Sequence, residues 1–124
     1  MIPRHRLRNR RESETIPLEF GGNRYKLTIG LYDDGRPGEA FIDDAKTGSH
    51  MAALLNDASI LISLLLQHGV PASSFGNSLG KHHKDGEHCS VIGKCVGLLA
   101  MEERAVLPPV KELIVLLGME DLKE

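Results

Sequence analysis

The stretch from Phe41 to Pro71, FIDDAKTGSHMAALLNDASILISLLLQHGVP, holds the longest periodic run of apolar residues in the chain. Ser49 is suited to begin a helix, because its hydroxyl can accept a hydrogen bond from a free backbone N–H of the first turn. At the other end, Gly69 can adopt the left-handed conformation that follows many helices, and Pro71 cannot continue one. The sequence therefore predicts a helix from about residue 50 to residue 68.

This helix is expected to turn one broad apolar stripe toward the core. The stripe comprises Met51, Leu54, Leu55, Ala58, Leu61, Ile62, Leu65 and Leu66. Ile60 and Leu64 fall on the opposite, mostly polar side, so a second cover is needed there. Either a helix near 109–117 or a second copy of the chain could supply it, and two-fold dimers are the commonest closed assembly. Ile60 and Leu64 are therefore candidate interface residues of a homodimer.

Three strands are expected ahead of this helix, near 14–20, 25–31 and 38–42, because apolar and polar residues alternate there. Pro17 has no backbone N–H, so the first strand should lie at a sheet edge. The short turns at 21–23 and 33–35 can join only antiparallel neighbours. The sequence predicts an α+β domain, in which an antiparallel three-stranded meander precedes a long core helix and further helices near 91–102 and 109–117.

A chain of 124 residues is expected to form one domain. No uninterrupted apolar run is long enough to span a bilayer, and no secretory signal begins the chain, so we expect no membrane partner. Two cysteines suggest a reducing compartment, with the cytoplasm as the default. Charge divides the chain into a basic N-terminal arm, residues 1–11, and an acidic single domain, residues 12–124.

The arm carries five arginines, Arg4, Arg6, Arg8, Arg10 and Arg11, and no acidic residue. Such an arm could bind phosphate or nucleic acid. It could equally be solvated, or dock on its own body or on an acidic partner. The arm has no aromatic residue on which a base could stack, which favours the solvated or docked alternative.

A second polar cluster lies near the C-terminal half, where His82, His83, His88, Cys89 and Cys95 fall within fourteen residues. Imidazole and thiolate are the ligands that zinc prefers, and a tetrahedral site needs four of them. His83, His88, Cys89 and Cys95 are the candidate set, and zinc is the one cofactor suggested. Their spacing matches no standard paired-ligand pattern. The alternative is a solvated loop over 81–88, with Cys95 buried as a small hydrophobe on the next helix.

Several segments, taken in order, resemble the TSCPD-type domain, which is found near the C-terminus of vitamin B12-dependent (class II) ribonucleotide reductases and as small free-standing bacterial proteins. The matching segments are Leu7 to Arg11, Asp34 to Arg36, Glu39 to Ile42, Lys46-x-Gly48-Ser49, Ser63 to Pro71, and Ser90 to Gly93. The run from Ser63 to Pro71 is the most specific of them. Together they cover roughly residues 7 to 99.

The resemblance implies a fold and a setting without catalytic machinery. A reductase of that class needs a large barrel, a radical-bearing cysteine, a cysteine pair and a cobalamin pocket, which 124 residues with two cysteines cannot supply. The threonine-serine-cysteine-proline-aspartate motif of the family name is also absent. We therefore expect a non-catalytic accessory domain that acts through protein contacts. The alternative is a small nucleic-acid- or nucleotide-binding regulator that uses the arginine arm, with a zinc-stabilised His/Cys loop.

Overall fold

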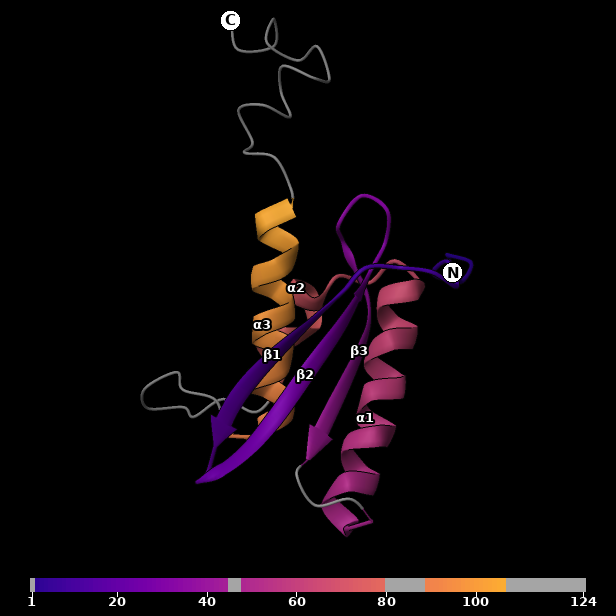
Figure 1. The fold of residues 1–124 in the computed structure, drawn as a ribbon. Helices are drawn as coiled ribbons and strands as arrows, with labels where there is room; N and C mark the ends of the chain where they lie inside the picture. Colours follow the sequence, from indigo (N-terminus) through magenta and orange to yellow (C-terminus); the bar gives the residue numbers. More distant parts are fainter. Residues whose placement is uncertain (1, 45–47, 80–88, 107–124) are drawn as a thin grey trace, which may run out of the picture.

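A computed structural model describes residues 2–44, 48–79 and 89–106, and it confirms the α+β prediction (Figure 1). The strands are β1 (Ser13–Phe20), β2 (Asn23–Leu31) and β3 (Pro37–Asp44), and the helices are α1 (His50–Gln67), α2 (Ala72–Phe75), a short 3-10 turn (Gly76–Ser78) and α3 (Val91–Val106). The helix predicted near 109–117 lies outside the described residues.

The three strands form an antiparallel sheet in the order β1–β2–β3. Gly21 and Gly22 join β1 to β2 with φ angles of 59° and 81°. Two successive positive φ angles define a tight hairpin turn whose twist suits the flanking strands, and glycine adopts them without steric cost. The register sets Leu27 of β2 between Ile16 of β1 and Ile42 of β3. Alternate residues of all three strands therefore place their apolar side chains on one face.

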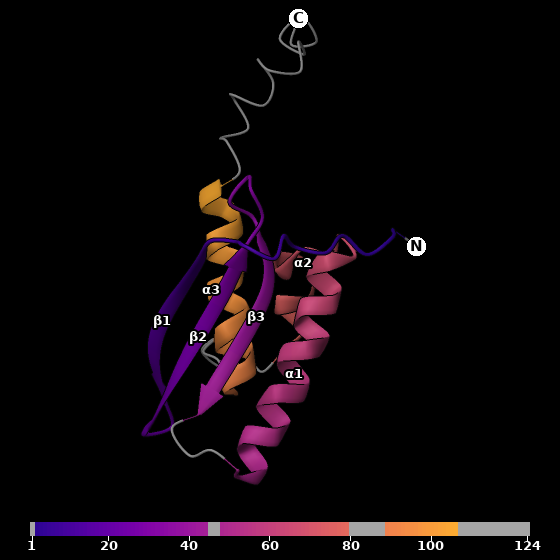
Figure 2. The same ribbon diagram turned by 45° about the vertical axis from the view of Figure 1, so that its right-hand side comes forward.

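Helix α3 covers that apolar face. It lies behind the sheet in both Figure 1 and Figure 2. Its buried residues join the side chains of β2 and β3 in one core cluster, and they are Val91, Cys95, Val96 and Leu99. The core is mostly aliphatic, with Tyr25 as a buried aromatic member, in a chain without tryptophan and with three phenylalanines.

Helix α1 lies along the free edge of β3 (Figure 2), held by three polar side chains on one side of the helix. Ser59 Oγ accepts a hydrogen bond from the Ile42 N–H at 2.9 Å, and Ser63 Oγ accepts one from the Ala40 N–H at 2.9 Å. Gln67 Nε2 donates to the Gly38 carbonyl at 3.0 Å.

The spacing of the two elements makes this contact possible. Four residues of a helix advance about 6.0 Å, and two residues of a strand advance about 6.7 Å. A row of polar residues at every fourth position of α1 can therefore follow the outward-facing backbone groups at every second position of β3. The helix takes the place of a fourth strand and removes an exposed sheet edge, which would otherwise invite pairing with another chain. At the other edge, Pro17 of β1 offers no N–H to a further strand.

The predicted core stripe of α1 is wrong for half of its members. Leu55, Ile62 and Leu66 are buried, but the exposed fractions of Met51, Leu54, Leu61 and Leu65 are 44, 48, 63 and 38%. The cause is the polar row just described. Because Ser59, Ser63 and Gln67 face β3, the side of the helix that carries the four exposed apolar residues turns away from the sheet.

Candidate functional site

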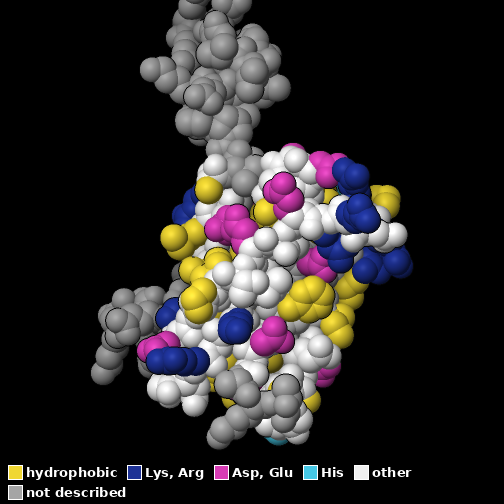
Figure 3. Space-filling view, in the orientation of Figure 1, with side chains coloured by type: hydrophobic (Ala, Val, Ile, Leu, Met, Phe, Trp, Pro, Cys, Tyr) yellow, Lys and Arg dark blue, Asp and Glu magenta, His cyan; other side chains and the backbone are white. Residues whose placement is uncertain are grey.

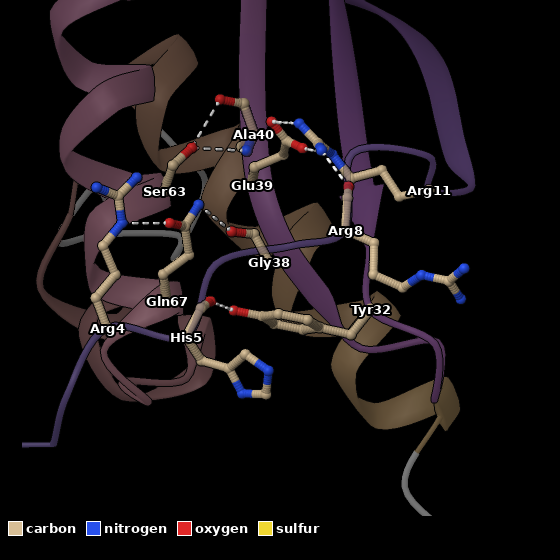
Figure 4. A network of polar contacts seen from close by, with 10 residues as sticks. All are labelled: Arg4, His5, Arg8, Arg11, Tyr32, Gly38, Glu39, Ala40, Ser63 and Gln67. Carbon is tan, nitrogen blue, oxygen red and sulfur yellow. Dashed lines mark hydrogen bonds and ion pairs between the residues drawn. The ribbon is translucent and has the colours of Figure 1, made fainter.

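Residues 2–12 cross the end of the sheet where β3 begins and α1 ends, and they bond to both (Figure 4). Gln67 is the central acceptor: its side-chain Oε1 accepts from Arg4 Nε at 2.7 Å, and its backbone carbonyl accepts from the His5 N–H at 2.6 Å. Tyr32 donates its hydroxyl to the His5 carbonyl at 2.5 Å. Since Gln67 also donates to Gly38, one amide side chain connects the arm, the helix and β3.

Burial raises the pKa of Tyr32, and the nearby positive charges of Arg36 and Arg4 oppose that rise. The phenol therefore stays protonated at neutral pH and can act as the donor to the His5 carbonyl. The His5 ring also contacts the Tyr32 ring, with 5.1 Å between their centroids. These contacts hold the arm against the body through the backbone of His5 as well as through its side chain.

Arg11 forms an ion pair that joins the arm to the sheet. Its guanidinium pairs with Glu39 through two bonds, Nε to Oε2 and Nη2 to Oε1, the second at 3.2 Å. Glu39 is only 7% exposed, whereas the Arg11 side chain is 32% exposed, so the carboxylate is the buried member of the pair. Gly30, opposite Glu39 on β2, makes room for it: a Cβ at position 30 would lie 2.4 Å from Glu39 Oε2. The pair therefore depends on a glycine on the neighbouring strand.

The docked alternative therefore describes the arm. Arg4 and Arg11 bond to the body as given above, and Arg8 pairs with Asp33 at 3.2 Å on the surface. Three of the five guanidinium groups thus have acceptors within the chain, which leaves them less available to phosphate. Nucleic-acid binding through the arm stays a prediction that no contact in the described residues favours.

The predicted zinc ligands are not brought together by the part of the chain that the structure describes. His83 and His88 lie outside the described residues, Cys89 is exposed, and Cys95 is fully buried on α3. Burial raises the pKa of the Cys95 thiol to about 12, so this thiol stays protonated and packs as a hydrophobe. Within residues 2–44, 48–79 and 89–106, no three His, Cys, Asp or Glu side chains gather as a metal site would require. The zinc site stays a prediction.

The outer face of α1 is the second feature, and it is defined by Met51, Leu54, Ala58, Leu61 and Leu65. Figure 3 shows apolar side chains along the right-hand edge of the molecule, where Figure 1 places α1. Apart from its histidine, the helix contains one charged residue, Asp57. Exposed helix faces usually carry many charges, so this face has the composition of a contact surface.

A shallow apolar groove of about 680 Å³ continues this face at the C-terminal end of α1. It is lined by Ile2 of the arm and by Leu61, Leu64, Leu65, His68, Gly69 and Val70. His68 Nδ1 lies 2.8 Å from the Ile2 carbonyl oxygen, so the arm forms one wall of the groove. Leu64, a candidate interface residue, is half-buried in this lining, while Ile60 is 49% exposed on another side of the helix. An interface at these two residues stays a prediction.

Length and composition alone would allow α1 to cross a bilayer. The hydrogen bonds from Ser59, Ser63 and Gln67 to β3 instead make it an integral part of the domain. Sequence reasoning did not identify this polar row. The sequence feature that could have predicted it is a serine or glutamine at every fourth position of an otherwise apolar helix beside a sheet.

Comparison with known proteins places this fold in a family. The sequence model of the TSCPD domain matches residues 2–102. Vitamin B12-dependent ribonucleotide reductases from Bradyrhizobium diazoefficiens and Agrobacterium fabrum are 40% and 43% identical to the chain over 75 and 72 residues. These matches cover 60% and 58% of the chain and 6% of each reductase, and no solved structure matches. Because the family match spans most of the chain, from the arm through the sheet and α1 into α3, the protein belongs to the TSCPD domain family.

Proposed function

We propose that this protein is a non-catalytic accessory domain, related to a segment of vitamin B12-dependent ribonucleotide reductases, that acts by contact with another polypeptide. The chain is similar to only a small part of those large enzymes. Of its two cysteines, Cys95 is buried with a raised pKa, which does not suit a thiol that must react. These observations support a role outside the chemical step.

The outer face of α1 is the observation that carries the proposal. Full burial of a leucine or methionine side chain is worth about 1.5–3 kcal/mol, and the four large side chains of this face are about half exposed. Covering them would therefore release about 3–6 kcal/mol. An uncharged surface that would release this much free energy on being covered is better explained by a protein contact than by exposure to water.

The proposal is tested by measuring whether this face becomes covered. Leu61→Cys, placed in a Cys89→Ser background, puts one reactive thiol on the face, because Cys95 stays unreactive. Its alkylation rate is compared with that of Ser78→Cys, an exposed position on the 3-10 turn. Both rates are measured in dilute protein, in concentrated protein, and after addition of a vitamin B12-dependent ribonucleotide reductase.

We expect the thiol at position 61 to be protected in concentrated protein or by the reductase, while the thiol at position 78 stays reactive. Equal rates at both positions under every condition would overturn a contact at this face. The non-catalytic part is tested separately. The chain, supplied with a ribonucleotide, cobalamin cofactor and a dithiol reductant, should form no deoxyribonucleotide, and turnover would contradict the proposal.

A further inference from the structure

We infer that the outer face of α1 binds the same face of a second copy of the chain, in an antiparallel two-fold pair centred on Ala58. This inference rests on the proposed function, because it names the partner of the same surface. The pattern of side chains, their lack of charge, and the groove at one end of the helix each support it.

The pattern of the face is close to palindromic. Met51 and Leu65 lie seven positions before and after Ala58, and Leu54 and Leu61 lie four before and three after it. A two-fold axis through Ala58 reverses the order of the helix. It therefore sets Met51 against Leu65 of the second copy, and Leu54 against Leu61 of the second copy. A two-fold interface requires a surface complementary to itself, and this spacing meets that requirement.

The sizes of the side chains fit a close crossing. Ala58, the smallest side chain of the face, lies at the centre, where two helices that cross approach most closely. The larger leucine and methionine side chains lie on either side of it, where the separation grows. Alternating steps of three and four residues from Met51 to Leu65 match the spacing by which side chains of paired helices interlock.

The charge distribution also permits the pair. Asp57 is the one acidic residue of α1, and the helix contains no lysine or arginine, so the pairing forces no row of like charges together. An antiparallel arrangement sets the N-terminal end of each helix beside the C-terminal end of the other. Opposed helix dipoles attract, whereas parallel ones repel.

The groove receives the end of the second helix. In the antiparallel pair, Met51 of the second copy lies near Leu65, where the groove lined by Ile2 and Leu64 opens. Methionine is unbranched and flexible, so it fills irregular apolar gaps well. The arm, held on α1 by Arg4 and the His5 backbone, supplies Ile2 to this wall and so takes part in the interface.

The size of the surface sets the expected affinity. A helix of 18 residues is about 27 Å long, so one such face and the groove bury less than the roughly 800 Å² per partner of a standard interface. We therefore expect a dimer that dissociates on dilution, with a dissociation constant on the order of micromolar. Concentration dependence is thus part of the prediction.

The test is the mass of the full chain in solution, measured by sedimentation equilibrium over a range of concentrations. The parent protein should change from 13.6 kDa at low concentration to twice that mass at high concentration. Leu61→Glu places a charge on the face and should remain at the monomer mass while folded. Phe41→Glu is the matched control, because Phe41 is 47% exposed on β3 and is not part of the outer face of α1, and this variant should dimerise as the parent does.

Two outcomes would overturn the inference. The first is a parent protein that stays monomeric at every concentration, and the second is a dimer that Leu61→Glu leaves intact. If the parent is monomeric and a chain ending at residue 106 dimerises, the remaining C-terminal residues are what covers the face. A monomer whose position 61 is nevertheless protected by the reductase would refute the second copy and leave the proposed function standing.

Discussion

Replacement of Ser59 by alanine tests the hydrogen-bonded contact between α1 and β3. Ser59 is 2% exposed, and its hydroxyl accepts from the Ile42 N–H at 2.9 Å while donating to the Leu55 carbonyl at 2.7 Å. In Ser59→Ala the Leu55 carbonyl still accepts the helical hydrogen bond from the backbone N–H of residue 59. The Ile42 N–H, in contrast, loses its acceptor in a site that water does not reach. An unsatisfied buried donor costs about 1–3 kcal/mol, so the free energy of unfolding should fall by that amount.

The measurement is urea denaturation followed by circular dichroism, with two comparison variants. Ser63→Ala removes the acceptor of the Ala40 N–H at a half-buried position, where water can replace the hydroxyl, so its loss should be smaller, about 0.5–1.5 kcal/mol. Ser78→Ala alters an exposed serine and should change stability by less than about 0.5 kcal/mol. If Ser59→Ala is no more destabilising than Ser78→Ala, the helix does not satisfy the edge of β3 as described.

Two further predictions concern charged and ionisable groups. Arg11→Ala leaves the buried Glu39 carboxylate without its partner and should lower the free energy of unfolding by about 1.5–3 kcal/mol. Arg8→Ala breaks an exposed ion pair and should lower it by less than about 1 kcal/mol. Equal losses for the two variants in chemical denaturation would contradict a buried Glu39 carboxylate. In a thiol titration at about pH 8, only Cys89 should react in the native protein, because the Cys95 thiol, with its pKa raised by burial to about 12, forms almost no thiolate. Two reactive thiols before unfolding would show that α3 does not bury Cys95.

Much of the fold could be predicted because local rules act over short distances. Alternation located the three strands, and Pro17 identified β1 as an edge. The helix signals were also correct: Ser49 Oγ accepts from the Ala52 N–H at 3.0 Å, and Gly69 has a φ of 83°. Each of these features depends on residues close in sequence, so a single chain carries enough information to predict it.

The orientation of α1 could not be predicted in the same way. A helical period shows which residues share a side of the helix, but it does not show which side meets the sheet. The predicted stripe left out Ser59, Ser63 and Gln67, whereas these side chains bond to the backbone of β3. The same stripe placed Leu61 in the core, although its side chain is 63% exposed.

The contacts of the arm also lay beyond sequence reasoning. The Arg11–Glu39 pair joins residues 28 positions apart, and the space for it depends on the register that sets Gly30 opposite Glu39. A basic stretch indicates that acidic groups or phosphates will be attracted, without showing which ones. Docking of the arm on its own body had been one of the open alternatives, and three-dimensional contacts were needed to choose it.

Cross-linking at Ala58 tests the symmetric contact of α1 most directly. In a Cys89→Ser background, Ala58→Cys sets two thiols across the proposed two-fold axis, where a close helix crossing can bring them within disulfide distance. Mild oxidation of concentrated protein should give a product of twice 13.6 kDa that a reductant reverses, and Ser78→Cys should give little. If the thiols at position 58 cross-link no more than those at position 78, the symmetric contact is contradicted.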